Sequence, residues 1–276
     1  MSKIWFITGV SGGLGRALAH EAAQQGDVVV GTLRKRDQFS DFESLVPGKT
    51  FPVLADVTHF KEVEAGIEYA ISRFGRLDVL VNNAGYGLMG AVEELSEDQI
   101  RHQMEVNFFG ALNAIRCALP FMRKQRSGHI LNISSIAGLN GTNGGALYNA
   151  SKFALEGLSE GLTLEVKPLG IAVTIVEPGP FRTKWAGEGL INAQKSISDY
   201  EESAHLIHER LANINGKQAG DPDKAARLMW KITRVEHPPL RLLLGASAYS
   251  LIERKMQKKL DEFAEWKSEG IATDFD

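Results

Sequence analysis

The sequence predicts a doubly wound α/β fold, with a seven-stranded parallel sheet in a single domain. Short runs rich in branched apolar residues alternate with stretches in which apolar residues recur every three or four positions. This alternation is typical of a parallel sheet with helices on both faces. The length of 276 residues is compatible with one such domain. We expect strands at residues 4–8, 28–33, 50–55, 79–83, 129–134, 172–177 and 240–245.

The chain opens on a strand, a glycine turn and a helix. The apolar run at residues 4–8 leads directly into a turn that contains Gly9, Gly13 and Gly15. A helix with one apolar face follows, and Gly26 ends it. Further apolar periodicity predicts the remaining helices. We expect helices near residues 15–25, 60–74, 97–123, 147–168, 222–235 and 246–267.

The glycine turn has the properties of a phosphate-binding site. Glycines permit a tight turn and close approach of a ligand, while free N–H groups and the dipole of the following helix attract a pyrophosphate. We expect Gly9, Ser11, Gly13 and Leu14 to line that pyrophosphate. The spacing differs from the commoner dinucleotide fingerprint, and a turn of this kind can also be purely structural.

Three polar residues point to proton transfer. Tyr148 and Lys152 lie four residues apart on a predicted helix and therefore share a face. The ammonium group is expected to favour the ionised phenol and to lower its pKa from about 10. Ser135 can donate a hydrogen bond to a carbonyl oxygen that the phenol protonates. By itself, a Tyr-x-x-x-Lys pair is common enough to arise by chance.

Other motifs accompany the Tyr148–Lys152 pair in a fixed order, and they make a chance match unlikely. The chain contains, in order, Thr8-Gly-x-x-x-Gly13-x-Gly15, Asn82-Asn83-Ala84-Gly85, Asn107, Ser135, Tyr148-x-x-x-Lys152, and Pro178-Gly179 with Thr183. In this order the chain resembles the short-chain dehydrogenase/reductase family, in its compact single-domain form, from about residue 3 to residue 185. The resemblance implies a Rossmann fold that spans residues 1–276. It also implies a catalytic tetrad of Asn107, Ser135, Tyr148 and Lys152.

The resemblance further implies an enzyme that interconverts a carbonyl and a secondary alcohol by hydride transfer from or to a nicotinamide. Tyr148 would act as the general acid or base, and Ser135 would position the substrate. Lys152 would also bind the nicotinamide ribose, and Asn107 would hold a water that links Lys152 to solvent. The carboxamide of the nicotinamide would lie against Pro178, Gly179 and Thr183.

The adenosine half of the cofactor is expected at the ends of the next strands. Asp56 and Val57 follow the third strand and should flank the adenine, whereas Asn83 follows the fourth and should lie near the adenosine ribose. Asp56 can also serve as a helix N-cap, and the two roles are compatible.

The end of the second strand predicts NADP(H), with NAD(H) as the less favoured alternative. An NAD enzyme usually carries a carboxylate at this point, but Leu33 stands there and the first acid after it is Asp37. Arg34 can bind a 2′-phosphate through its planar guanidinium group. The alternative interpretation is that Arg34, Lys35 and Arg36 are simply solvated.

Residues 184–221 interrupt the alternation of strands and helices. They have helical potential but no predicted strand, and an insertion of this length in a compact domain is usually functional. We expect a lid that binds the substrate. The pocket should also draw on residues 86–89, 139–143 and 181–185, which mix apolar side chains with the polar side chains of Asn140, Thr142 and Asn143. The substrate itself cannot be identified from this lining.

Composition and charge give no support for several other classes of protein. A net charge of −3 and a pI near 6.2 give no support for nucleic-acid or anionic-membrane binding. Cys117 is the single cysteine, and the seven histidines lack metal-ligand spacing, so we predict no disulfide framework and no metal. The chain enters its first strand directly and carries no apolar run of membrane-spanning length. We therefore expect a cytoplasmic protein.

Two other functions share parts of this pattern. A nucleotide-sugar epimerase or dehydratase has the Tyr and Lys, but it usually has different glycine spacing and a longer C-terminal domain. A nonenzymatic NADP(H) sensor typically lacks a tetrad residue, and all four are present here.

We also expect a homodimer or homotetramer, because members of the resembled family commonly pair through the two long helices. The apolar residues considered for this contact, which can instead face the sheet, are Ala111, Ala114, Ala118, Phe153, Leu155, Leu158 and Leu162.

Overall fold

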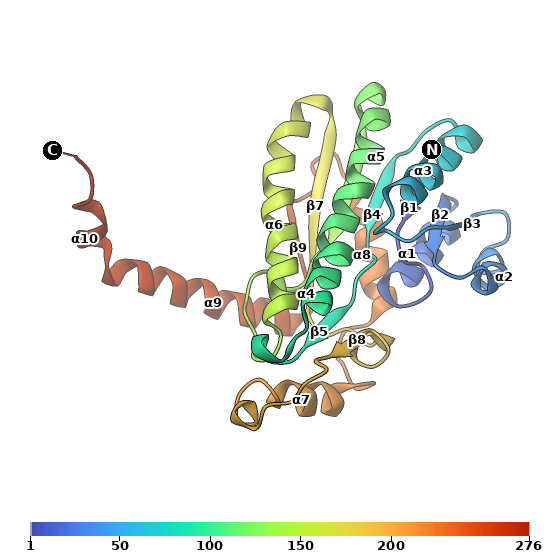
Figure 1. The fold of residues 1–276 in the computed structure, drawn as a ribbon. Helices are drawn as coiled ribbons and strands as arrows, with labels where there is room; N and C mark the ends of the chain where they lie inside the picture. Colours follow the sequence, from blue (N-terminus) through green and yellow to red (C-terminus); the bar gives the residue numbers. More distant parts are fainter. Residues whose placement is uncertain (1, 276) are drawn as a thin grey trace.

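The computed structural model describes residues 2–275 and contains the predicted sheet. Its seven strands are all parallel, in the order β3-β2-β1-β4-β6-β7-β9. Figure 1 shows the sheet with helices packed on both faces, so the predicted fold class is confirmed. The strands are β1 (Ile4–Ile7), β2 (Val28–Leu33), β3 (Thr50–Leu54), β4 (Val79–Asn82), β6 (Gly128–Ile133), β7 (Ile171–Pro178) and β9 (Arg241–Leu244).

Two apolar cores fill the space between the sheet and its helices. Trp5 and Phe6 are adjacent in β1, point to opposite faces and are fully buried, one in each core. Because both faces are covered, the strands read as continuous apolar runs. One face carries α1 (Gly13–Gln24), α2 (Phe39–Glu43) and α8 (Pro222–Ile232), and the other carries α3 (Phe60–Phe74), α5 (Gly110–Gln125) and α6 (Ala146–Val166).

A second, two-stranded sheet corrects the expectation of no strand in the insertion. β8 (Leu190–Asn192) pairs in parallel with β5 (Gly87–Met89), below the main sheet in Figure 1. Both strands have three residues, too few to show a periodic pattern. The pairing ties the insertion to the segment after β4. The insertion also contains α7 (Leu206–Ile214) and short 3-10 turns at Lys184–Ala186 and Ser198–Tyr200. Other 3-10 turns lie at Arg36–Gln38, Val92–Glu94, Ile136–Gly138 and Lys167–Leu169.

The helix predicted at residues 97–123 is divided in two. α4 (Glu97–Met104) and α5 are separated by a π-helical turn at Glu105–Phe109. Such turns are frequent at functional sites, and this one contains Asn107. Its cause is tertiary, because the Asn107 side chain bonds to two other segments described below.

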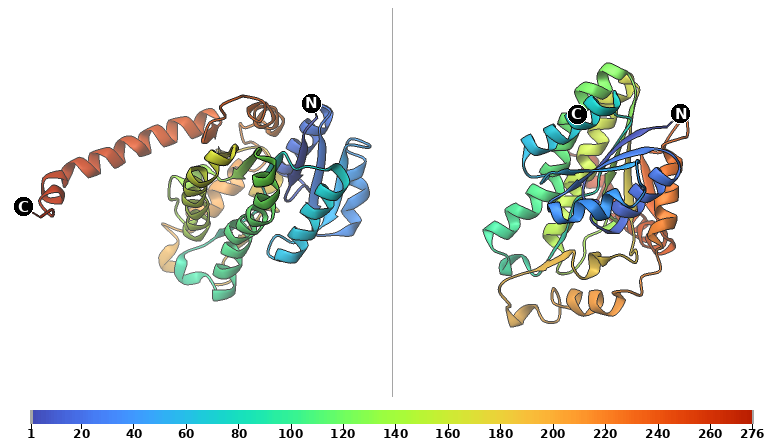
Figure 2. Two further views of the ribbon diagram at one scale, coloured as in Figure 1. Left: turned by 90° about the horizontal axis from the view of Figure 1, so that it is seen from above. Right: turned by 90° about the vertical axis from the view of Figure 1, so that its right-hand side faces the viewer.

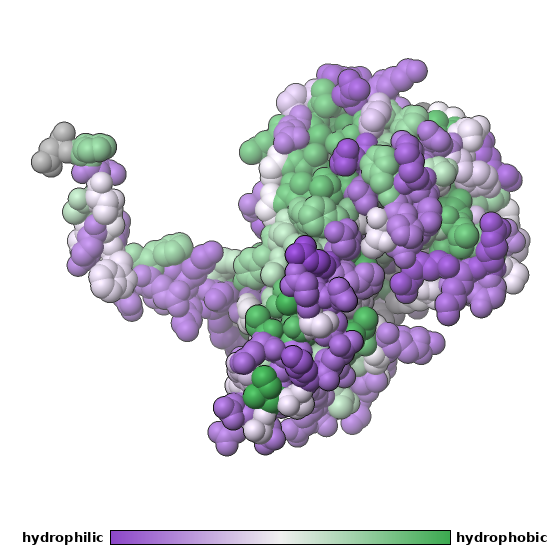
Figure 3. All heavy atoms as spheres, viewed as in Figure 1, coloured by the Kyte–Doolittle hydropathy of each residue, from purple (hydrophilic) through white to green (hydrophobic). Residues whose placement is uncertain are grey.

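Most of the residues considered for a subunit contact face the sheet instead. Ala111, Ala114, Ala118, Leu155 and Leu162 are buried, and Leu158 packs partly into the same core. These side chains are therefore not available for a contact between subunits. Phe153 is the exception, since it is 46% exposed. Figure 3 shows hydrophobic residues on the front face over α5 and α6. Association through this face stays a prediction.

The C-terminal helix leaves the body of the protein. α9 (Ala246–Glu265) extends away from the sheet and is followed by α10 (Lys267–Ile271), as the left view in Figure 2 shows. Only its first turns touch the body, where Ala248 is fully buried. None of the helices within residues 2–275 has the length and apolar character needed to span a membrane.

Candidate active site

The glycine turn between β1 and α1 forms an open cradle. Gly9 and Gly13 have φ angles of 72° and 58°, a left-handed conformation that favours glycine. A Cβ atom at Gly12 would meet nothing within 4 Å, and one at Gly13 would meet only the Thr183 side chain, at 3.8 Å. The turn can therefore accept a ligand against its backbone, and the N–H groups at the start of α1 would face an anion bound there. The donor set and the open space fit a dinucleotide pyrophosphate.

Asn83 braces this turn from the end of β4. Its Nδ2 donates hydrogen bonds to the carbonyl oxygens of Thr8 at 2.9 Å and of Gly9 at 2.8 Å. A Cβ atom at Gly15 would lie 2.2 Å from that Nδ2, so only glycine fits this position. The predicted contact of Asn83 with the ribose stays a prediction, and the structure adds a bracing role that sequence spacing did not reveal.

Arg34 and Asp56 lie together where an adenosine is expected. Arg34 is exposed after β2 and close enough to Asp56 to affect its charge. Burial opposes ionisation of Asp56, but hydrogen bonds from Thr58 and the charge of Arg34 lower its pKa overall. Asp56 Oδ1 accepts from Thr58 N at 2.9 Å and from Thr58 Oγ1 at 2.8 Å. Because α3 starts at Phe60 with His59 at the N-cap position, the interpretation of Asp56 as a helix cap is wrong.

Other predicted cofactor residues surround the same edge. Val57 is buried, and a Cβ atom at Gly110 would lie 2.6 Å from its Cγ2. Pro178 ends β7, and Gly179 N donates to Leu244 O at 2.9 Å. The remaining predicted contacts in this region are Ser11, which is exposed, and Leu14, which packs at the edge of the core beneath α1.

The four tetrad residues converge beside the cradle. Tyr148 and Lys152 occupy successive turns of α6, with the Lys152 Nζ 5.9 Å from the centre of the Tyr148 ring. A hydrogen bond joins the Ser135 hydroxyl to the Tyr148 phenol. Lys152 Nζ donates to Ile133 O at 2.8 Å. The end of β6 therefore positions both the serine and the lysine against the tyrosine.

The ionisation of Tyr148 differs from the sequence-based expectation. Burial raises the pKa of Tyr148 to about 12, and the hydrogen bond with Ser135 only partly opposes this rise. Burial also lowers the pKa of Lys152 to about 8, while Glu156 acts in the opposite direction. The expected lowering of the Tyr148 pKa by Lys152 is therefore wrong for this structure, because the cost of burying a phenolate exceeds the attraction of the ammonium group.

Asn107 organises the floor of the site. Its Nδ2 donates to Tyr86 O at 2.9 Å and to Ser151 Oγ at 3.0 Å, and its Oδ1 accepts from Tyr86 N at 3.1 Å. Ser151 Oγ in turn donates to Tyr148 O at 2.7 Å. One turn earlier, Gln103 Nε2 donates to Tyr86 O at 3.2 Å. Sequence reasoning missed Gln103 and Ser151, although Gln103 lies four residues before Asn107 on the same predicted helix.

A buried charge cluster continues from Lys152 along α6. Glu156 is one turn further and nearly fully buried, as is Glu177 on β7. Arg241 on β9 contacts the carboxylates of Glu156, Glu177 and the more exposed Glu160. Burial raises the pKa of Glu156, and it raises that of Glu177 to about 7. The cluster connects the last strand to the helix that carries the tyrosine.

The insertion covers Tyr148. The Trp185 ring lies 5.3 Å from the Tyr148 ring, centre to centre, at 46°. Apolar side chains from β5, the insertion and the loop after β6 complete this cover and leave Tyr148 buried. We call this set the Tyr148 cover, and its other members are Met89, Ala137, Leu190, Ile207 and Leu211.

The predicted pocket lining is therefore right only in part. Phe181 bridges to Gly220 at the base of the insertion and packs toward the core under α1 and α8, so it does not join the Tyr148 cover. Thr142 and Asn140 are bound by Asn149, whose Oδ1 accepts from Thr142 N at 3.0 Å and whose Nδ2 donates to Asn140 O at 3.0 Å. Asn149 therefore holds the shape of this loop, and it engages the hydroxyl of Thr142 as well, at 3.1 Å.

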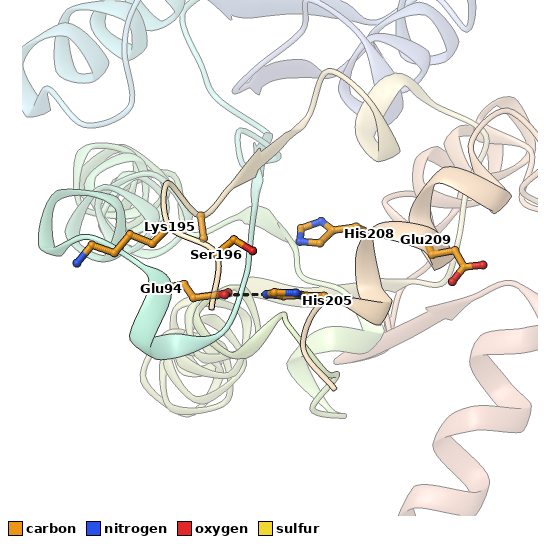
Figure 4. A pocket seen from close by; sticks show the side chains of 7 residues that line it. Glu94, Lys195, Ser196, His205, His208 and Glu209 are labelled. Atoms are coloured by element: carbon orange, nitrogen blue, oxygen red, sulfur yellow. Dashed lines mark hydrogen bonds and ion pairs between the residues drawn. The ribbon is translucent and has the colours of Figure 1, made fainter. Parts of the chain in front are cut away.

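Glu94 fastens the insertion to the body. Its carboxylate accepts from Ile197 N at 2.7 Å and from Ala91 N at 2.8 Å, and a 2.7 Å hydrogen bond joins it to His205 Nε2. Figure 4 shows Glu94 and His205 pointing toward each other and joined by this bond in the lining of a pocket. These hydrogen bonds, led by that from Ile197, lower the pKa of Glu94 to about 2. No local pattern in the sequence marks Glu94 as buried, although its side chain is 1% exposed.

Metal ligands are not grouped in this structure. Within residues 2–275, no set of three or more His, Cys, Asp or Glu side chains is arranged to hold a metal ion.

Comparison with known proteins finds relatives that match along almost the whole chain. Residues 3–191 match the family described as short chain dehydrogenase. Oxidoreductase BOA17 of Botryotinia fuckeliana is 36% identical over 275 residues, which cover 99% of this chain and 100% of that protein. The 3-ketodihydrosphingosine reductase of Bacteroides thetaiotaomicron is 38% identical over 243 residues, which cover 88% of this chain and 88% of that protein. A crystal structure of a short-chain dehydrogenase from Streptomyces avermitilis is 38% identical, with a TM-score of 0.93 over 100% of both chains.

More distant solved structures hold nicotinamide cofactors. ElxO with NADP bound is 27% identical with a TM-score of 0.75, covering 91% of this chain and 100% of ElxO. A Burkholderia phymatum enzyme in complex with NAD shares the fold, at 24% identity and a TM-score of 0.83 over 94% of this chain and 95% of that one. Together with the cradle and the converging tetrad, these matches support a nicotinamide cofactor and show that the chain belongs to the short-chain dehydrogenase family of oxidoreductases.

Proposed function

We propose that the protein is an NADP(H)-dependent oxidoreductase that interconverts a carbonyl and a secondary alcohol, with Tyr148 as the general acid or base. The observation that carries this proposal is the convergence of the glycine cradle and the buried Tyr148, Lys152 and Ser135 at one edge of the sheet. A nicotinamide cofactor held there would supply or accept the hydride.

The residues of the chain divide the remaining work. At neutral pH a phenol with a pKa near 12 is protonated, which suits proton donation to a carbonyl oxygen during reduction. Ser135 orients that oxygen, and Lys152 returns a proton toward Tyr148. A Cβ atom at Gly85 would lie 3.1 Å from Asn107 Oδ1 and 3.7 Å from Lys152 Nζ. The glycine thus leaves space beside both groups, which suits the water proposed for Asn107.

We propose an apolar carbonyl compound as the substrate, with the segment at residues 184–221 as its lid. The Tyr148 cover is apolar, and Asn149 engages both the backbone N–H and the hydroxyl of Thr142 in the 139–143 loop. The relative from Bacteroides thetaiotaomicron, whose name is that of a keto-compound reductase, agrees with this class. The test is a panel of ketones of graded polarity, with the rate of NADPH oxidation measured for each. Apolar ketones should react fastest, and turnover confined to the polar ones would contradict the proposed substrate class.

Cofactor preference should depend on Arg34. Charge-assisted hydrogen bonds to phosphate contribute about 1.5–3 kcal/mol, so Arg34→Ala should weaken NADPH binding about ten- to a hundredfold and change NADH binding little. Lys35→Ala, the neighbouring exposed cation, is the matched control and should have a much smaller effect. Fluorescence titration of the wild type and of both variants with NADPH and with NADH measures these affinities. Equal losses for both cofactors, or a wild type that prefers NADH, would reject the assignment. Leu33 is 2% exposed, so an acid placed there would also disturb the core.

The rate of reduction should fall as pH rises through about 8. Burial lowers the Lys152 pKa to about 8, so the ammonium form is present below that pH and is lost above it. Glu156 raises this pKa, so Glu156→Gln should move the alkaline limb of kcat/KM to lower pH. Glu160→Gln changes an exposed carboxylate of the same helix and should leave the limb in place. A limb near pH 10, or one unaffected by Glu156→Gln, would contradict this role.

A further inference from the structure

The helix α9 presents an apolar face that no described part of the chain covers. We call residues 249–266 the arm, which projects past the edge of the sheet in Figures 1 and 2. Leu260 and Phe263 are each 62% exposed, and Trp266 is 71% exposed. Side chains of this kind rarely gather on an exposed helix without a partner. Figure 3 shows hydrophobic residues along one edge of the arm and hydrophilic residues along the other.

The spacing of the apolar residues is that of a coiled coil. Tyr249, Met256 and Phe263 are separated by seven residues, and Ile252 and Trp266 take the intervening positions. The central intervening position is Lys259, whose Nζ lies 5.9 Å from the centre of the Phe263 ring. The arm therefore carries the pattern of one side of a two-helix seam, with one charged residue at its middle.

The charges of the arm are ordered along its length. Four basic residues (Arg254, Lys255, Lys258 and Lys259) and four acidic ones (Glu253, Asp261, Glu262 and Glu265) give a net charge of zero, which offers no attraction to an anionic lipid surface. All the basic residues precede all the acidic ones except Glu253. The arm is therefore complementary to an antiparallel copy of itself.

The register of such a pair follows from the heptad. Antiparallel seams place Tyr249 against Trp266 of the second copy and Ile252 against Phe263 of the second copy. Lys259 then meets Met256, whereas a parallel pair would oppose two copies of Lys259. Beside the seam, Lys255 comes next to Glu262 of the second copy, and symmetry repeats this pair.

We propose that α9 is a dimerisation arm that pairs antiparallel with α9 of a second copy of this chain. Each copy contributes three aromatic side chains, and such a side chain can bury about 150–250 Å². Together with their aliphatic neighbours, the two paired arms would bury a total surface on the order of 1,000 Å². That area approaches the range of specific interfaces, about 1,200–2,000 Å². The arm pair supplies one association step in addition to any contact through α5 and α6.

The seam is tested by sedimentation velocity at micromolar concentrations of the full-length protein. Phe263→Asp places a charge in the seam and should halve the mass of the wild-type assembly. Ala264→Asp places the same charge on the adjacent outer face and should leave the mass unchanged. Because neither residue packs on the body, the melting temperature should stay that of the wild type. Equal assembly of Phe263→Asp and the wild type would overturn the proposal.

The orientation is tested by exchange of charges. Lys255→Glu or Glu262→Lys alone turns two attractive pairs into repulsive ones and should weaken association about five- to tenfold. The double variant restores opposite charges across the seam and should regain wild-type association. Failure of the double variant to recover would overturn the antiparallel pairing, and it is the result expected if the arm instead docks on the body of the second copy. Binding of the wild type to phospholipid vesicles, with no self-association, would equally reject the proposal.

Discussion

Replacement of Tyr148 by phenylalanine is expected to lower kcat for carbonyl reduction by about 10³-fold or more. The phenol is the proton donor in the proposed reaction, and a positioned acid or base contributes about 10²–10⁴-fold. The substitution keeps the ring that packs against Trp185, so NADPH affinity and the melting temperature should change little. Steady-state kinetics and fluorescence titration measure the two effects separately.

Tyr200→Phe is the matched control for this experiment. It removes a hydroxyl that binds Glu93 at an exposed position of the insertion, and it should retain near wild-type kcat. If Tyr148→Phe kept a tenth or more of the wild-type rate, the proton would have to come from elsewhere and the proposed mechanism would fail.

Replacement of Arg241 by methionine is expected to destabilise the fold by about 2–3 kcal/mol near neutral pH. The substitution leaves the buried carboxylates of Glu156 and Glu177 without their cation, and breaking a buried ion pair typically costs about 3–5 kcal/mol. We take a lower value because about a third of Arg241 is exposed to solvent. Urea denaturation at several pH values measures the loss.

The pH dependence of this loss has a definite sign. Burial raises the pKa of Glu177 to about 7 in the folded protein, above the usual value of about 4.3. A raised carboxyl pKa means that folded-state stability is lost as pH rises between these values. Without Arg241 the pKa rises further, so the deficit of the variant should be larger at pH 8 than at pH 5. Glu160→Gln, at the exposed partner, should change stability by less than about 0.5 kcal/mol. A pH-independent deficit would argue against a charged cluster.

The main sheet could be predicted from the sequence because its strands are buried on both faces. Continuous apolar runs such as Ile4–Ile7 mark such strands with little ambiguity. The three-residue strands β5 and β8 could not, because their pairing is formed between segments about 100 residues apart in the chain. The π-helical turn at Asn107 also depends on distant partners, Tyr86 and Ser151.

The tetrad could be located from motifs, whereas its electrostatics could not. Spacing places Lys152 beside Tyr148, but the pKa of the phenol depends on burial by Trp185 and the rest of the Tyr148 cover. The bracing by Asn83, Gln103 and Glu94 likewise arises from tertiary hydrogen bonds. Periodicity predicted a helix at residues 246–267, but only the three-dimensional arrangement shows that its apolar face is uncovered.

Tyr148 and its partners are proposed to support hydride transfer between NADP(H) and a carbonyl carbon. The decisive measurement is a single-turnover reaction of the protein with an apolar ketone and NADPH that carries deuterium at both C4 positions, followed by mass spectrometry of the product. We expect one deuterium on the carbinol carbon of a secondary alcohol, formed in step with NADPH oxidation and absent with Tyr148→Phe. Tight NADPH binding without deuterium transfer to any member of a broad ketone panel would contradict it and favour a nonenzymatic cofactor-binding protein.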